Sequence, residues 1–243
     1  MRSANPTLKN NTFTAARAGE EVMTLSGTVN KTGFSVLILL ATASLTWNQV
    51  FPAAMMGPIF LVALIAGLGI ALFTTFQPRW APITAPAYSA VQGLVLGALS
   101  SMFELRYPGI VINAVALTLG ILVALLLAYS SGWIRVTENM KLGILAATGG
   151  IALVYIVSMV LGFFGKTVPL IHESGLVGIG FSLFVVVIAS LNLVMDFDFI
   201  EGGVEKGAPR YMEWYGAFAL IVTLVWLYIE VLNLLAKLQG RNR

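Results

Sequence analysis

The sequence predicts an all-α polytopic membrane protein with seven transmembrane helices, and two observations lead to this class. Hydrophobic residues make up 58% of the 243-residue chain and charged residues only 10%, whereas about 25% of the residues in a typical soluble domain are charged. Eleven acidic and fourteen basic residues cannot form a polar shell around a core of this size. In addition, long segments carry no charge at all, as expected for helices that need roughly 20 apolar residues to cross a bilayer.

These charge-free segments predict the number and position of the helices. No charged residue lies between Lys31 and Arg79, a gap long enough for two spans, and residues 47–52 are typical of an interfacial turn between them. Four later gaps hold one span each, and the last apolar stretch is interrupted only by Glu230 and Lys237. The runs of Leu, Ile, Val and Ala are continuous rather than alternating, which excludes barrel strands. We expect helices at 33–51, 54–76, 83–105, 108–131, 142–164, 174–200 and 211–238.

The chain is accordingly divided into a polar N-terminal tail (1–31), a seven-helix transmembrane domain (32–238) and a short basic C-terminal tail (239–243). Lys and Arg are more numerous in the loops on the side of the N-terminus, which predicts that the N-terminus is cytoplasmic. Seven spans then place the C-terminus outside. The basic C-terminal tail, however, favours the cytoplasmic side, so a last helix that enters the membrane and returns without crossing it is an alternative. Gly93 and Gly97 have helix-packing spacing, which we interpret as a general feature of a compact bundle.

Motifs of enzymes are absent from the sequence. There is no cysteine and a single histidine, so thiol chemistry and a histidine metal cage are excluded, and neither a Gly-rich phosphate loop nor an HExxH or GxSxG motif occurs. We therefore expect no enzymatic activity and no resident cofactor. The net charge of +3 is small, so we expect no nucleic-acid partner, and the lipid bilayer is the expected surrounding of the chain.

Acidic residues in or beside the spans are the informative candidates, because a carboxyl group in a membrane is costly and usually faces the bundle interior or a water-filled cavity. Asp196 follows Asn192 by one helical turn, which gives span six a polar stripe, and Asp198 lies close to the end of that span. Glu230 lies deep in span seven among Leu, Val, Ile and aromatic residues, whereas Glu213 lies at the start of this span. A carboxyl at the depth of Glu230 is expected to be neutral unless paired, because desolvation penalises its charged form.

The last two spans carry a recognisable pattern. The run Leu193-Val-Met-Asp-Phe-Asp-Phe199, followed by Leu227-Tyr-Ile-Glu-Val-Leu-Asn-Leu-Leu235, resembles the transmembrane Bax inhibitor motif family, and its bacterial branch in particular. The segments 23–31 and 201–215 are similar to that branch as well. The resemblance covers nearly the whole chain and implies a seven-span bundle with the final helix central and six helices packed around it.

The resemblance also implies a function. Members of the family are associated with a pH-sensitive calcium leak and, in eukaryotes, with protection from cell death, whereas some bacterial members bind and restrain a membrane protease. The family's acidic pair corresponds here to Asp196 and Glu230, which are the expected calcium ligands and pH sensor. Ca²⁺ prefers oxygen ligands, and two neighbouring carboxyl groups titrate as a coupled pair. Protonation would then switch the pair between a closed state with a shared proton and a separated, conducting state.

Several positions leave alternatives open. Gln92 stands before Gly93 where the family often has Glu, and it keeps hydrogen-bonding capacity without the charge. If the last two spans are antiparallel, Glu230 would lie about 20 Å deeper than Asp196 at 1.5 Å per residue, so Glu213 is an alternative partner by depth. Arg79, in the loop between spans two and three, could latch onto the acidic cluster, although a topological role explains it equally well.

Together with the acidic residues in the last two spans, the resemblance therefore implies an integral protein of the bacterial inner membrane that provides a pH-gated leak for calcium or other cations. Asp196 with Glu230 or Glu213 would form the sensor, with Asp198 nearby, and Gln92 and Asn192 would be polar positions inside the bundle. Calcium ions and protons are the expected small partners. The alternative is a membrane regulator that transports nothing and uses the N-terminal tail to bind a membrane protease or another membrane complex.

Overall fold

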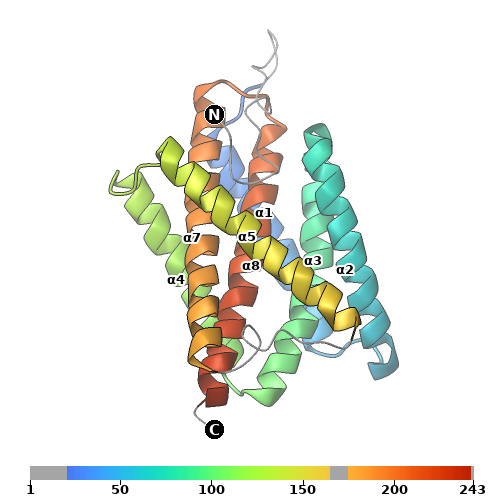
Figure 1. Ribbon diagram of the computed structural model, residues 1–243. Coiled ribbons are helices and arrows are strands. Elements are labelled where there is room, and N and C mark those ends of the chain that lie inside the picture. Colours follow the sequence, from blue (N-terminus) through green and yellow to red (C-terminus); the bar gives the residue numbers. More distant parts are fainter. Residues whose placement is uncertain (1–20, 165–174, 242–243) are drawn as a thin grey trace.

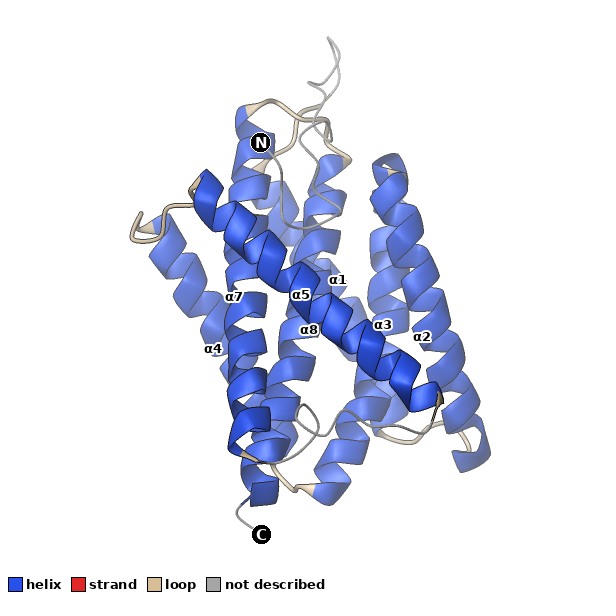
Figure 2. Ribbon diagram, viewed as in Figure 1, coloured by secondary structure: helices blue, strands red, loops and turns tan. Residues whose placement is uncertain are grey.

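A computed structural model describes residues 21–164 and 175–241 and confirms the all-α membrane fold. Within these residues, seven helices are long and apolar enough to cross a membrane, and the described connections between them are short loops (Figure 2). The helical elements, in chain order, are α1 (Leu25–Trp47), α2 (Ala53–Phe76), the 3-10 turn η2 (Pro78–Trp80), α3 (Ala81–Arg106), α4 (Ile110–Ser130), α5 (Glu138–Phe163), α7 (Leu176–Glu205) and α8 (Met212–Arg241).

The two largest differences from the expected helix boundaries, at the start of α1 and at the end of α7, both involve charged residues. α1 begins at Leu25 rather than at residue 33, because the Thr24 side chain caps the helix by accepting a hydrogen bond from the Gly27 N–H. α7 continues to Glu205 rather than ending at residue 200, and the chain turns only at Gly207, whose φ is +60°. Residues 25–31, expected in the polar tail, therefore belong to α1, while residues 1–20 and 242–243 of the two expected tails lie outside the described residues.

The last helix lies in the middle of the bundle, as expected. α8 packs against α1, α3, α4 and α7, whereas α2 packs against α3 on the outside (Figure 1). α5 crosses obliquely over α7 and α8 in the same view and reaches α8 through a hydrogen bond from Tyr155 to Glu230. Four helices thus make the main contacts with α8, α5 reaches it at Glu230, and α2 lies in the outer layer against α3.

The outer helices explain the composition of the chain. Most large apolar side chains of α2, α4 and α5 are exposed, including Leu61, Ile65, Leu127 and Val157. α8 has the largest share of buried residues among the seven helices. Lipid rather than a polar shell covers the exposed apolar faces, so a chain with few charged residues can still be stable in a bilayer.

α1 and α3 approach each other closely at two glycines. A Cβ atom on Gly93 would overlap the Thr42 hydroxyl and the Leu39 carbonyl oxygen, and one on Gly97 would overlap the Ala43 carbonyl. Here the Thr46 hydroxyl donates a hydrogen bond across the interface to the Leu94 carbonyl oxygen at 3.0 Å. The two glycines therefore have a specific packing role, and their interpretation as a general feature was wrong.

We predict that Gly97→Ala destabilises the protein by about 1–3 kcal/mol, because overpacking forces the α1 and α3 backbones apart. Gly120→Ala is the matched control, since a methyl group there meets no atom within 4 Å, and its effect should be within roughly 0.5 kcal/mol. Denaturant unfolding of the detergent-purified protein measures both. Equal effects of the two substitutions would contradict a packing role for Gly97.

Candidate functional site

The central feature of the bundle is a buried contact between α7 and α8. The side chain of Asp196 is fully buried, and the hydroxyl of Thr223, which is also buried, donates a hydrogen bond to its Oδ2 at 2.6 Å. Because α7 continues to Glu205, Asp196 lies well inside the helix rather than one turn from its end. The structure thus places a carboxyl group within the apolar core that α7 and α8 share.

Because Thr223 contacts Asp196, its position on α8 marks the depth of Asp196 relative to Glu213 and Glu230. Glu213 precedes it by ten residues on α8 and Glu230 follows it by seven, which correspond to about 15 Å and about 10 Å along the helix axis at 1.5 Å per residue. Glu230 is therefore closer in depth to Asp196 than the expected 20 Å, because Asp196 lies deeper than its assumed position. The structure nevertheless brings neither glutamate beside Asp196, and in the described segments no three His, Asp or Glu side chains gather in a group that could hold a metal ion.

Glu230 lies in a polar site of its own between α5 and α8. Its side chain is almost fully buried, and its Oε1 accepts hydrogen bonds from the Tyr155 hydroxyl at 2.7 Å and from the Trp226 indole N–H at 3.2 Å. Glu230 also lines a cavity of about 630 Å³ at the end of the bundle where α3 and α8 end. We call this the C-terminal cavity. It gives Glu230 a polar route towards that end of the bundle.

Glu213 forms an ion pair instead of the expected pair with Asp196. Its carboxylate is buried and accepts a hydrogen bond from the Lys31 ammonium group. Its Oε1 also accepts hydrogen bonds from the Thr24 N–H at 2.9 Å and the Thr24 hydroxyl at 2.8 Å. A Cβ atom on Gly27 would overlap this carboxylate, so the glycine leaves the space that Glu213 occupies. The ion pair joins the start of α1 to the start of α8.

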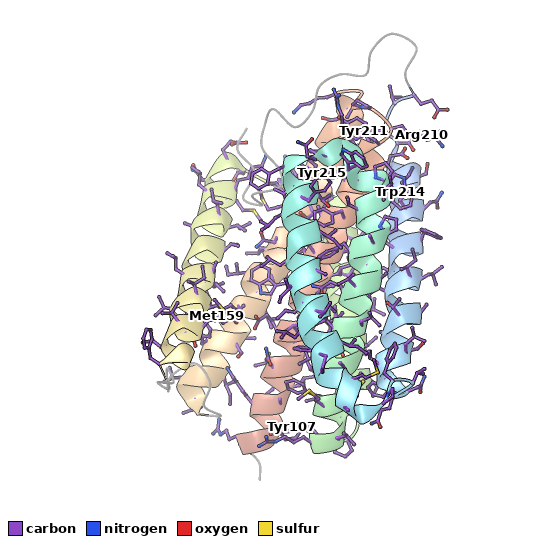
Figure 3. All side chains as sticks on the ribbon, turned by 90° about the vertical axis from the view of Figure 1, so that its right-hand side faces the viewer. Tyr107, Met159, Arg210, Tyr211, Trp214 and Tyr215 are labelled. Carbon is purple, nitrogen blue, oxygen red and sulfur yellow. The ribbon has the colours of Figure 1, made fainter. Side chains whose placement is uncertain are left out.

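A second cavity, of about 720 Å³, lies beside Glu213 at the end of the bundle where α1 and α8 begin. We call this the N-terminal cavity. The extended residues before α1 border this cavity. Two backbone hydrogen bonds fix them to the loop before α8: the Met23 N–H donates to the Ala208 carbonyl oxygen at 2.7 Å, and the Arg210 N–H donates to the Glu21 carbonyl oxygen at 2.9 Å. Arg210 also forms an ion pair with Glu21. Tyr211 and Trp214 lie at this end of the molecule and Tyr107 at the other (Figure 3), as is typical of aromatic residues at the two membrane interfaces.

Buried aromatic side chains pack against α8 in the segment between Glu213 and Thr223. Phe218 lies on α8 between Glu213 and Thr223, with its ring centroid 5.1 Å from that of Tyr88 and 6.2 Å from that of Tyr215. All three side chains are buried. On the other side, Leu227 lies between Thr223 and Glu230 and is fully buried. Asp196 is thus separated from both cavities by apolar and aromatic packing.

Asp198 and Arg79 lie apart from this central region. Asp198 is about one-third exposed and forms an ion pair of 3.0 Å with Lys141, which also contacts Glu138 at 3.3 Å, so these residues join α5 to α7. Arg79 is exposed in η2. Among the described residues it forms no ion pair with a carboxylate, and the basic partner of the buried Glu213 is Lys31 instead.

The two expected polar positions have separate hydrogen bonds. Asn192 is buried and its Nδ2 donates to the Thr148 hydroxyl and to the Ile188 carbonyl oxygen, both at 2.9 Å, which fixes α5 against α7. Gln92 donates from its Nε2 to the Tyr88 hydroxyl at 3.1 Å, and its buried Oε1 has no hydrogen-bond partner among the residues that the structure describes. Gln92 therefore contacts the aromatic pair of Tyr88 and Phe218 through a hydrogen bond and not through a charge.

Sequence reasoning missed the contacts of Lys31 and Thr24 with Glu213. It also missed the hydrogen bond from Thr223 to Asp196. Lys31 was interpreted as a topological signal at the edge of the first span, and nothing in its neighbourhood shows that its partner is 182 residues further along the chain. The Thr24-x-x-Gly27 spacing of a capped helix start is a local signal that does predict the beginning of α1. Thr223 falls seven residues before Glu230, on the polar face of α8.

Comparison with known proteins agrees with this architecture. A family model described as Bax inhibitor 1 like matches residues 5–240. The chain therefore belongs to the Bax inhibitor 1 like family of membrane proteins. A search of curated proteins found no match.

We predict that Lys31→Met destabilises the protein by about 1–3 kcal/mol, because it leaves the buried Glu213 carboxylate without its charged partner. The double variant Lys31→Met/Glu213→Gln should be more stable than Lys31→Met alone, since it removes the unpaired carboxylate as well. Denaturant unfolding of both variants and of Glu213→Gln in detergent measures the coupling. A double variant as unstable as the sum of the two single variants would exclude an energetic pairing of Lys31 with Glu213.

Proposed function

We propose that this protein provides a pH-sensitive leak for calcium or other small cations across the bacterial inner membrane, and that Asp196 is the gating carboxyl group. The observation that carries this proposal is the fully buried Asp196 between two polar cavities at opposite ends of α8. Calcium is the cargo in this proposal, and no catalytic residue and no resident cofactor are required. The N-terminus is cytoplasmic in this assignment, so the N-terminal cavity faces the cytoplasm.

The spacing of oxygen-bearing side chains along α8 supports a cation path. Glu213, Thr223 with Asp196, and Glu230 follow one another over about 25 Å at 1.5 Å per residue. Hard cations such as Ca²⁺ prefer oxygen ligands. A charged group in the middle of a bilayer is costly and marks ion or proton pathways in membrane proteins. The described conformation corresponds to a closed state, because Asp196 is fully buried and lines neither of the two cavities.

Protonation of Asp196 accounts for the pH dependence. A protonated Asp196 is neutral and suits the apolar packing of the closed state, whereas an ionised Asp196 favours the entry of water and a cation to compensate its charge. The Thr223 hydroxyl can hydrogen-bond to either form, since it is both a donor and an acceptor. We therefore infer that the flux rises with pH and that Glu230 contributes as a second oxygen ligand when the packing around Leu227 opens.

The alternative of a membrane regulator without transport has no specific support in the described part of the chain. In that interpretation the N-terminal tail binds the partner protein. Most of this tail is residues 1–20, which lie outside the described residues. The remaining residues 21–24 contact the loop before α8 rather than extending from the bundle. The cation leak is thus the function that the geometry supports best.

We predict that Asp196→Asn in liposomes gives a low calcium flux that no longer varies between about pH 5 and pH 8, because the amide imitates the protonated acid. Asp198→Asn is the matched control, with the same chemical change two residues away in the pair with Lys141, and it should keep the wild-type pH profile. A calcium-sensitive dye inside the liposomes measures the initial rates. An unchanged pH profile in Asp196→Asn would show that another group senses pH, and wild-type flux no higher than that of empty liposomes would exclude the leak itself.

A further inference from the structure

The C-terminal cavity has a lining that a cation path does not explain. It lies among α3, α5, α7 and α8 and has a volume of about 630 Å³, within the range of roughly 300–1,000 Å³ that is typical of ligand pockets. One part of its wall is apolar and consists of Met102, Phe103, Ile229 and Ala236. The other part is polar and contains Arg106, Tyr107, Tyr155, Ser182, Glu230, Asn233 and Lys237.

The charge of the cavity is positive in either protonation state of Glu230. Arg106 and Lys237 are the basic residues of the lining and Glu230 is its acidic residue. If Glu230 is ionised, one positive charge remains, and if it is protonated, two remain. In the N-terminal cavity, by contrast, Glu21 and Glu213 balance Lys31 and Arg210. The excess of positive charge attracts an anion to the part of the C-terminal cavity that Arg106 and Lys237 line.

The two basic side chains approach the cavity from different helices. The Lys237 ammonium group is fixed on α7, since it donates hydrogen bonds to the Ser182 hydroxyl at 2.7 Å and the Gly178 carbonyl oxygen at 3.2 Å. Arg106 lies exposed at the end of α3, with its guanidinium carbon 5.7 Å from the centre of the Tyr107 ring. An arginine at such a position can bind a phosphate through two parallel hydrogen bonds.

We propose that the C-terminal cavity binds the phosphate group of an anionic ligand, with Arg106 and Lys237 as its partners, and that an anionic phospholipid supplies this group. Tyr107 lies at the end of the bundle, where a membrane interface is expected (Figure 3), so lipid headgroups reach the same depth. Basic pockets between transmembrane helices bind anionic headgroups in this way. The apolar wall contacts the glycerol and the first part of the acyl chains, which a free phosphate ion would leave uncovered.

Native mass spectrometry of the full chain in dodecyl maltoside tests this site. Phosphatidylglycerol and phosphatidylcholine with the same acyl chains are titrated separately, and inorganic phosphate is added as a competitor. We expect one phosphatidylglycerol molecule to bind on the order of tenfold more tightly than phosphatidylcholine. The double variant Arg106→Gln/Lys237→Gln should lose this preference. The control variant Arg79→Gln/Arg135→Gln, which removes two exposed positive charges at the other end of the bundle, should keep it.

Arg106→Gln alone provides a second test, because Arg106 is exposed and its replacement leaves the contacts of Lys237 with α7 intact. A partial loss of the preference in this variant supports the site even if the double variant does not fold. Displacement of phosphatidylglycerol by equimolar inorganic phosphate would support the same anion site with a free phosphate as its ligand. Equal binding of the two lipids without any effect of phosphate would overturn the proposal, and so would an equal loss of preference in the control variant. Neither result depends on calcium flux.

Discussion

A carboxyl group inside a bilayer has to be surrounded by protein, and this constraint determines the arrangement of the bundle. Glu213 and Glu230 lie on α8, and the buried Asp196 contacts the same helix through Thr223. Four helices therefore cover α8, whereas α2, which contains no charged residue, lies outside and faces lipid. The order of the helices around α8 thus follows from the cost of exposing its polar groups to hydrocarbon.

The three buried carboxyl groups differ in their partners, and this difference assigns them different roles. Glu213 is paired with the Lys31 ammonium group, which stabilises its charged form and makes it a structural link between α1 and α8. Glu230 accepts hydrogen bonds from Tyr155 and Trp226 beside a polar cavity. Asp196 is fully buried and accepts a hydrogen bond from the Thr223 hydroxyl, so ionisation of its side chain carries a desolvation cost.

The fold was largely predictable from the sequence, but the pairing of its polar groups was not. Segments without charge predict all seven spans, because each apolar run must be long enough to cross the bilayer. The same rule misplaced the start of α1 and the end of α7, since it treats every charge as a boundary. Lys31 is tolerated inside a helix because Glu213 neutralises it, and only the tertiary structure brings these residues together. The depth of Asp196 was misjudged for the same reason, because the charges that follow it still belong to α7.

Infrared difference spectroscopy tests the central claim, that Asp196 changes its protonation in the physiological pH range, more directly than flux does. Spectra of the reconstituted wild-type protein and of Asp196→Asn are compared between acidic and alkaline buffer. We expect a carbonyl stretching band of a protonated carboxyl group that appears on acidification in the wild type and is absent in Asp196→Asn. Identical difference spectra of the two proteins would contradict the assignment, because Asp196 would then keep the same protonation state throughout this range.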